Sequence, residues 1–153
     1  VPVLVDGDLV ISDSNAILVY LAETYDADAR WYPSDAALRA DVQRWLSAAA
    51  GPVAAGPGAA RLVTVFGANI DHERARSIAD GLLTTVNGEL AERPFLAGED
   101  ATIADLAAYA YIAHAPEGEV SLAPYPNVRA WLARIESFDR FVGMTRSTVG
   151  VAA

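Results

Sequence analysis

A four-residue motif, Thr102-Ile103-Ala104-Asp105, stands directly ahead of an almost wholly apolar run from Leu106 to Ala115. Thr and Asp at this spacing are typical of a capping box, in which each side chain accepts a hydrogen bond from the other residue's backbone N–H. The helix that begins here carries apolar residues on both sides. Because a helix that is apolar all round is buried all round, we expect the rest of the chain to wrap this helix.

Composition excludes several classes of protein for this chain. The 153 residues suffice for about one domain, and a hydrophobic content of 53% excludes a disordered chain. No apolar run approaches the roughly 20 residues of a membrane-spanning helix, so we expect no membrane partner. A net charge of −9 would repel nucleic-acid phosphates, so we expect no nucleic-acid partner either.

The sequence offers little support for metal or redox chemistry. The absence of cysteine excludes disulfides and thiolate metal sites, and it is compatible with a cytoplasmic protein. The two histidines, His72 and His114, do not stand at ligand spacing. We therefore expect no metal site, and we interpret His114, near the end of the apolar helix, as a structural residue.

The first 25 or so residues predict a strand, a tight turn, a second strand and a helix. Asp6-Gly7 separates the short β-type runs Val3–Val5 and Leu9–Ile11, and Asp-Gly between apolar runs is a strong hairpin signal. The cluster Ser12-Asp13-Ser14-Asn15 precedes the helix. Because the chain begins without Met inside a strand, we expect it to be a piece or a processed form of a longer protein.

Two interpretations fit the helix start at Asp13 and Ser14. Free N–H groups at a helix N-terminus favour an anion, and the Ser14 hydroxyl adds a directed donor. The Asp13 carboxylate beside them can receive an ammonium group. Together they would hold the head group of an α-amino acid, which carries both charges on one carbon. Simple N-capping is the alternative.

After Pro33 the hydrophobic period is helical throughout. We expect helices over about 34–50 and 59–66, between Asp71 and Pro94, from Pro126 onward, and a short one after Ser137. Glycines and prolines between Gly51 and Gly58 predict a break or a strong kink. The chain therefore divides into a small β-containing start and a helical bundle.

Three stretches, in the same order along the chain, resemble the cytosolic glutathione transferases of bacteria. The first is similar to the second half of their thioredoxin-like domain and includes Val1-Pro2-Val3-Leu4, Asp13-Ser14 and Tyr20-Leu21. The other two resemble their helical domain and comprise Phe95-Leu96-Ala97-Gly98 with Thr102–Asp105, and Pro126-Asn127-Val128 with Trp131. The resemblance implies a mainly α fold. Residues 1–27 would form a partial thioredoxin-like β-hairpin plus helix, 34–147 an all-α bundle, and 148–153 a tail.

The resemblance also implies how glutathione is bound. Pro2 would be a cis proline that turns the backbone of Val1 toward the cysteinyl part of glutathione. Asp13 and Ser14 would hold the γ-glutamyl ammonium and carboxylate. Thr102 and Asp105 would be structural, as their capping-box spacing also indicates.

The reaction implied by the resemblance is attack of the glutathione thiolate on an electrophilic small molecule, in a homodimer and without a metal. Trp45 and Tyr109 would be wall residues of the acceptor pocket. The family's thiol-activating residue precedes the match to Val1, so we assign no catalytic residue in this chain. Two other functions stay open, namely a non-catalytic transferase-like binding or scaffold protein and a glutathione-dependent isomerase or dehalogenase.

Overall fold

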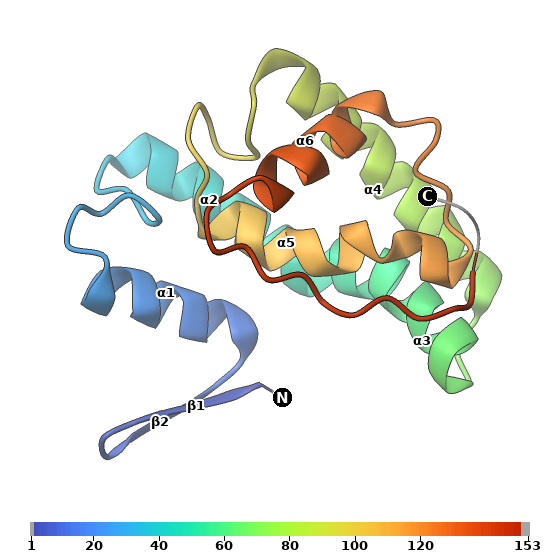
Figure 1. Cartoon of the computed structure of the whole chain (residues 1–153), viewed down its shortest axis with the longest axis horizontal. Coiled ribbons are helices and arrows are strands. Elements are labelled where there is room, and N and C mark those ends of the chain that lie inside the picture. Colours follow the sequence, from blue (N-terminus) through green and yellow to red (C-terminus); the bar gives the residue numbers. More distant parts are fainter. Residues whose placement is uncertain (1, 151–153) are drawn as a thin grey trace.

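The computed structural model describes residues 2–150, which form a β-hairpin and a helical bundle (Figure 1). Strands β1 (Val3–Asp6) and β2 (Leu9–Ser12) pair antiparallel, with Val3 opposite Ser12. Gly7 occupies the turn with φ of +58°, a conformation that glycine adopts without steric cost. The predicted hairpin is therefore confirmed.

Within residues 2–150, six α-helices follow the hairpin. A wide helical segment and a tight 3₁₀ turn connect some of them. The α-helices are α1 (Ser14–Tyr25), α2 (Ala36–Ala48), α3 (Ala59–Phe66), α4 (His72–Glu92), α5 (Ile103–Ala113) and α6 (Pro126–Glu136). The connecting segments are the wide helix η1 (Ala49–Gly58) and the 3₁₀ turn η2 (Ala115–Gly118). The predicted mainly α fold is confirmed. Within residues 2–150, no helix is both long and apolar enough to cross a membrane.

The predicted interruption between α2 and α3 is a kink and not a break. Segment η1 continues the helical path, and Gly51 departs from helical geometry with φ of −99° and ψ of −107°. Gly56 lies where η1 contacts α4, and a Cβ atom at this position would be 2.8 Å from the backbone nitrogen of Ala79. The missing side chain therefore allows a close backbone approach.

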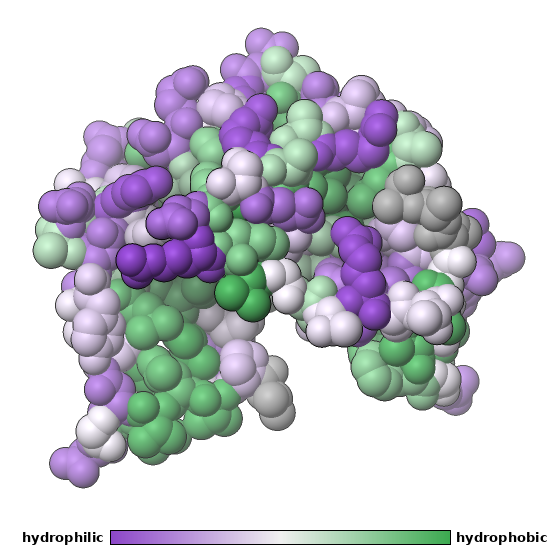
Figure 2. Space-filling model, viewed as in Figure 1, coloured by the Kyte–Doolittle hydropathy of each residue, from purple (hydrophilic) through white to green (hydrophobic). Residues whose placement is uncertain are grey.

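Helix α5 is the central helix of the bundle (Figure 1), and its capping box is confirmed. Asp105 accepts from the backbone N–H of Thr102 at 2.9 Å, and the Thr102 hydroxyl accepts from that of Ala104 at 3.2 Å. The expectation of burial on every side is wrong. Leu106 and Tyr111 are 37% and 43% exposed, because one side of α5 is left uncovered within residues 2–150. Figure 2 shows a broad concavity between the hairpin and α3 on this face.

The predicted short helix after Ser137 is also wrong. The chain turns at residues 137–140 and then runs extended along α5 (Figure 1). Arg140 has φ of +63°, which interrupts a right-handed helix. Even without this interruption, a helix of only a few residues would have marginal stability. The two phenylalanines of this segment instead pack separately, Phe138 near Phe95 and Phe141 near Tyr109.

Candidate functional site

Asp13 is held in a strained backbone conformation at the junction between β2 and α1. Its φ is +83° and its ψ is 124°, in a region where residues other than glycine are uncommon. Its side chain accepts a hydrogen bond from the backbone N–H of Ala16 at 2.9 Å, so it is the N-cap of α1. Asp13 is exposed, and the cap uses one of its two carboxylate oxygens. The other can receive a cation.

Ser14 and Asn15 are the first residues of α1, where backbone N–H groups have no acceptor within the helix. The Ser14 side chain is exposed. The Asn15 amide donates to the carbonyl of Leu46 at 2.7 Å, which fixes the start of α1 against α2. The N-terminus of α1 therefore presents free donors beside a carboxylate, in a position set by the helical bundle.

A shallow hollow of about 320 Å³ lies next to this helix start. It runs between α1 and α2 and is lined by Asp13, Asn15, Ala16, Val19, Gln43, Leu46, Ser47 and Ala50. Ser14 does not line it. The predicted pair Asp13 and Ser14 is thus adjacent, with Asp13 at the rim of the hollow and Ser14 exposed beside it.

The hairpin register brings the beginning of the chain to this junction. Val3 pairs with Ser12, so Pro2 directly precedes the first paired residue of β1, and Asp13 directly follows the last paired residue of β2. Pro2 is exposed. The other residue expected to bind glutathione, Val1, lies outside the described residues.

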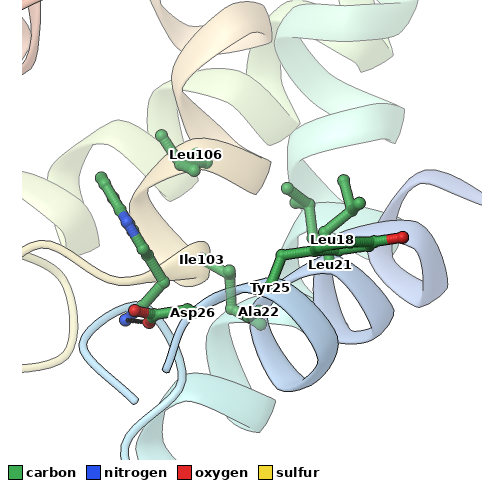
Figure 3. A pocket seen from close by; sticks show the side chains of 8 residues that line it. Leu18, Leu21, Ala22, Tyr25, Asp26, Ile103 and Leu106 are labelled. Atoms are coloured by element: carbon green, nitrogen blue, oxygen red, sulfur yellow. Dashed lines mark hydrogen bonds between the residues drawn. The ribbon is translucent and has the colours of Figure 1, made fainter. Parts of the chain in front are cut away.

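An apolar cleft of about 240 Å³ lies between α1 and the start of α5 (Figure 3). It is lined by Leu18, Leu21, Ala22, Tyr25, Asp26, Trp31, Ile103 and Leu106. The backbone of Trp31 is held by two hydrogen bonds. Its backbone N–H donates to the Asp26 side chain at 2.6 Å, and its carbonyl accepts from the backbone N–H of Ile103 at 2.9 Å. Ile103 and Leu106 belong to the helix expected to be buried, but only the tertiary structure places the eight residues around one cleft.

Trp45 and Tyr109, the two residues expected to line the acceptor pocket, are not among the residues that line this cleft. Trp45 is 2% exposed and belongs to the core, and its buried indole nitrogen has no hydrogen-bond partner among the described residues. Tyr109 is half-buried, and its hydroxyl donates to Glu136 at 2.7 Å. Burial and this hydrogen bond raise the pKa of Tyr109. Their role as acceptor-wall residues stays a prediction.

Asp6 joins the hairpin to α1 through the hydroxyls of Tyr20 and Tyr25. The sequence analysis did not predict this contact. Asp6 accepts from the hydroxyl of Tyr20 at 2.8 Å and from that of Tyr25. The hydrogen bond to Asp6 raises the pKa of Tyr25 to about 12, and the same contacts lower the pKa of Asp6. Tyr20 and Tyr25 are five residues apart on a helix, and only the fold of the hairpin indicates their shared partner.

A second polar cluster surrounds Glu117 in the turn after α5. Glu117 is 3% exposed; its Oε2 lies 2.6 Å from the Arg61 Nε and its Oε1 lies 2.6 Å from the His114 Nδ1. The interpretation of His114 as a structural residue agrees with this position. Burial alone would raise the pKa of Glu117, but hydrogen bonds from His114, Arg61 and Ser147 outweigh it and lower the pKa to about 2.

Among residues 2–150, no group of three or more His, Asp or Glu side chains is placed to hold a metal ion. The candidate site is the start of α1 with Asp13 and Ser14, and the later part of α1 also lines the apolar cleft that it shares with α5. What it offers chemically is an anion-binding helix N-terminus, a carboxylate for a cation and an apolar surface for a second molecule.

Residues 65–139 match the family model described as "Glutathione S-transferase, C-terminal domain". Among curated proteins, the chain is 35% identical over 146 residues to human glutathione S-transferase theta-2. That match covers 90% of this chain and 60% of the human protein. The chain thus spans about three fifths of the length of this relative.

Solved structures give the same relationship. A glutathione S-transferase from Pseudomonas fluorescens superposes with a TM-score of 0.86 and 30% identity, covering 93% of this chain and 72% of that one. A glutathione transferase homologue from Drosophila mojavensis, solved with bound glutathione, superposes with a TM-score of 0.76 and 29% identity. It covers 92% of this chain and 65% of that one.

Proposed function

Because the chain belongs to the glutathione S-transferase family, we propose that it carries part of the glutathione site and the acceptor side of a glutathione transferase. The reaction joins the glutathione sulfur to an electrophilic carbon of a small molecule. The thiolate supplies the electron pair of the new C–S bond, and the electrons of the broken bond leave with the leaving group or enter the acceptor's π system.

The observation that carries the proposal is the strained N-cap at Asp13. A non-glycine residue at φ of +83° persists only where the surroundings enforce it, and such strain gathers at ligand sites. In this conformation the Asp13 carboxylate stands beside the free amide of Ser14 at the helix N-terminus. We assign Asp13 to the γ-glutamyl ammonium of glutathione and Ser14 to its carboxylate.

Pro2 and Val1 complete the proposed glutathione contacts. The pairing of Val3 with Ser12 supports this assignment, because Pro2 and Asp13 are the residues that adjoin this pair in the sequence. From there the backbone of Val1 is proposed to pair with the cysteinyl part of glutathione. We assign no residue of this chain to activation of the thiol.

The uncovered side of α5 is the proposed acceptor wall. Leu106 and Tyr111 expose apolar surface there, and the side chain of Leu106 also lines the cleft of Figure 3. Trp45 and Tyr109 stay the proposed wall residues; Trp45 is buried, and Tyr109 is half-buried on α5, between Leu106 and Tyr111 in the sequence. An apolar wall favours an apolar electrophile.

The test is glutathione binding and conjugation by the full-length protein, with Asp13→Asn as the central variant. Asn keeps the side-chain oxygen that caps Ala16 and tolerates positive φ, but it lacks the charge that pairs with the ammonium. We expect glutathione to bind about tenfold more weakly to the variant, while the matched control Asp8→Asn, exposed in the hairpin turn, binds normally. Equal affinity of Asp13→Asn and the wild type contradicts the assignment.

Product analysis of the same reactions separates the alternatives. Glutathione binding without turnover of any electrophile favours a non-catalytic binding or scaffold protein. Release of halide or of a rearranged acceptor with glutathione regenerated favours a dehalogenase or an isomerase. We further propose, from the family resemblance alone, a cytoplasmic homodimer that acts in detoxification. Sedimentation of the full-length protein tests the dimer.

A further inference from the structure

The last described segment of the chain, residues 141–150, lies along α5 as a strap (Figure 1). At its beginning, the ring of Phe141 meets the ring of Tyr109 edge-on, with centroids 5.3 Å apart. Further along, Arg146 donates to the carbonyl of Ala113 at 3.3 Å. Beyond the end of α5, the backbone N–H of Ser147 donates to Glu117 Oε1 at 3.1 Å. The strap therefore follows α5 from its middle to its end.

The partner of Ser147 is a buried anion that the bundle fixes in place. Arg61 from α3 and His114 from the end of α5 each reach the Glu117 carboxylate at 2.6 Å. On the α4 side, His72 lies 3.0 Å from the carbonyl of Gly118, next to Glu117. Because Arg61 and His114 contact Glu117 from the bundle, they hold the carboxylate whether or not the strap is bound. A fixed and desolvated carboxylate is a strong acceptor.

The strap also approaches the same turn closely at its far end. Gly150 has φ of +100°, and a Cβ atom there would overlap the carbonyl of Pro116 and the Cα of Glu117. The hydrogen bond of Ser147 and the close approach of Gly150 are independent contacts, and both converge on the turn that carries Glu117. By contrast, Val142 between the anchors is 90% exposed.

We propose that Glu117 is a latch that holds the strap on α5, and that breaking its bond to Ser147 frees the strap while the helical bundle stays folded. The strap borders α5 next to the proposed acceptor wall, so the latch would also limit the size of the acceptor that fits. This second consequence rests on the proposed function, whereas the first does not. In the effect on acceptor size, Glu117 is a positioning residue and touches no substrate.

The decisive comparison is Ser147→Pro against Ser147→Ala. Proline removes the N–H that donates to Glu117, whereas alanine keeps it and removes only a buried hydroxyl that has no hydrogen-bond partner among the described residues. Val142→Pro controls for proline in the strap. Hydrogen exchange of the full chain, read by mass spectrometry, measures opening. We expect strap amides to exchange about tenfold faster in Ser147→Pro alone, with the amides of α4 and α5 unchanged. Equal strap exchange in Ser147→Pro and Ser147→Ala overturns the latch.

A double-mutant cycle tests whether Glu117 and Ser147 act through one contact. Glu117→Ala should free the strap as Ser147→Pro does, and the double variant should exchange no faster than either single one. If the double variant instead accelerates strap exchange by the product of the two single factors, separate contacts hold the strap and the assignment of Glu117 is overturned. Because the readout is exchange within the strap, it also distinguishes release of the strap from general unfolding, which would speed exchange throughout the bundle.

Conjugation by the full-length protein tests the acceptor-size consequence. Ser147→Pro should lower the KM for a bulky aromatic electrophile several-fold, with little change for a small one and none for glutathione. An unchanged KM for both electrophiles overturns this consequence. If no electrophile is conjugated at all, the proposed function fails, yet the exchange experiment still decides the latch.

Discussion

The indole N–H of Trp131 donates to Asp105 Oδ1 at 2.9 Å, and this one bond ties α6 to the beginning of α5. The same carboxylate accepts from the backbone N–H groups of Leu96 and Thr102, each at 2.9 Å. Asp105 is fully buried. It therefore joins the turn before α5, the N-terminus of α5 and the middle of α6, in addition to closing the capping box.

Replacement of Asp105 by alanine should destabilise the bundle strongly. Three buried donors would lose their acceptor, and each such loss costs about 1–3 kcal/mol, so we expect the free energy of unfolding to fall by at least about 3 kcal/mol. Urea denaturation measures this, with the exposed Asp100→Ala as control. Because Asp13 lies outside this network, the folded variant should bind glutathione normally. A parallel loss of affinity would show that the network reaches the site.

The capping box illustrates what a sequence can predict. Thr102 and Asp105 are three residues apart, so their contact is local and their spacing in the sequence predicts it. The bonds from Asp105 to Leu96 and Trp131 cross between separate segments. Leu96 shows no polar side chain in the sequence, because it uses its backbone N–H. Only the folded chain shows that the capping carboxylate serves two further segments.

The uncovered side of α5 shows where pattern reasoning failed. Apolar residues of α5 such as Leu106 predicted burial all round, yet Leu106 and Tyr111 remain exposed within residues 2–150. Periodicity reports which residues favour an apolar neighbour, but not whether a neighbour is present. Trp45, which the resemblance implies as a wall residue, is buried in this structure, and its role at the acceptor wall stays a prediction.

The hairpin contact of Asp6 should be visible in the titration of Tyr25. The hydrogen bond to this carboxylate raises the pKa of Tyr25 to about 12. In Asp6→Asn the acceptor charge is gone, so the pKa of Tyr25 should move back toward 10. NMR of tyrosine ring carbons, assigned with Tyr25→Phe, measures it, and Asp8→Asn is the matched control. An unchanged titration would mean that the Asp6–Tyr25 contact does not form in solution.

The Glu117 cluster should make the bundle sensitive to acid. Its carboxyl has an ordinary pKa near 4.5 when unfolded and about 2 when folded, so it stabilises the fold above about pH 4.5. This contribution, up to roughly 3 kcal/mol, is lost as the pH falls from 4.5 toward 2. Burial instead raises the pKa of Asp105, so the contribution of Asp105 decreases as the pH rises through its raised value.

Comparison with Glu117→Gln isolates the Glu117 part of this pH dependence. We expect the free energy of unfolding, from urea denaturation, to fall more steeply below pH 4.5 in the wild type than in Glu117→Gln. The variant should be less stable at pH 7, because Arg61 loses its buried ionic partner. Identical slopes in the two proteins below pH 4.5 would contradict the assignment.

Two glycines of the helical bundle should respond in opposite directions to alanine. Gly56 has no room for a Cβ atom, which would lie 2.8 Å from the backbone nitrogen of Ala79, and backbone cannot easily move aside. Gly56→Ala should therefore cost about 1–3 kcal/mol by forcing η1 and α4 apart. Gly81 lies on an exposed side of α4 with nothing within 4 Å of its Cβ position. Gly81→Ala should stabilise the protein by about 0.5–1 kcal/mol, because alanine loses less conformational entropy in a helix. Thermal and urea unfolding of both variants measure the two effects, and stabilisation by Gly56→Ala would contradict the close packing of η1 on α4.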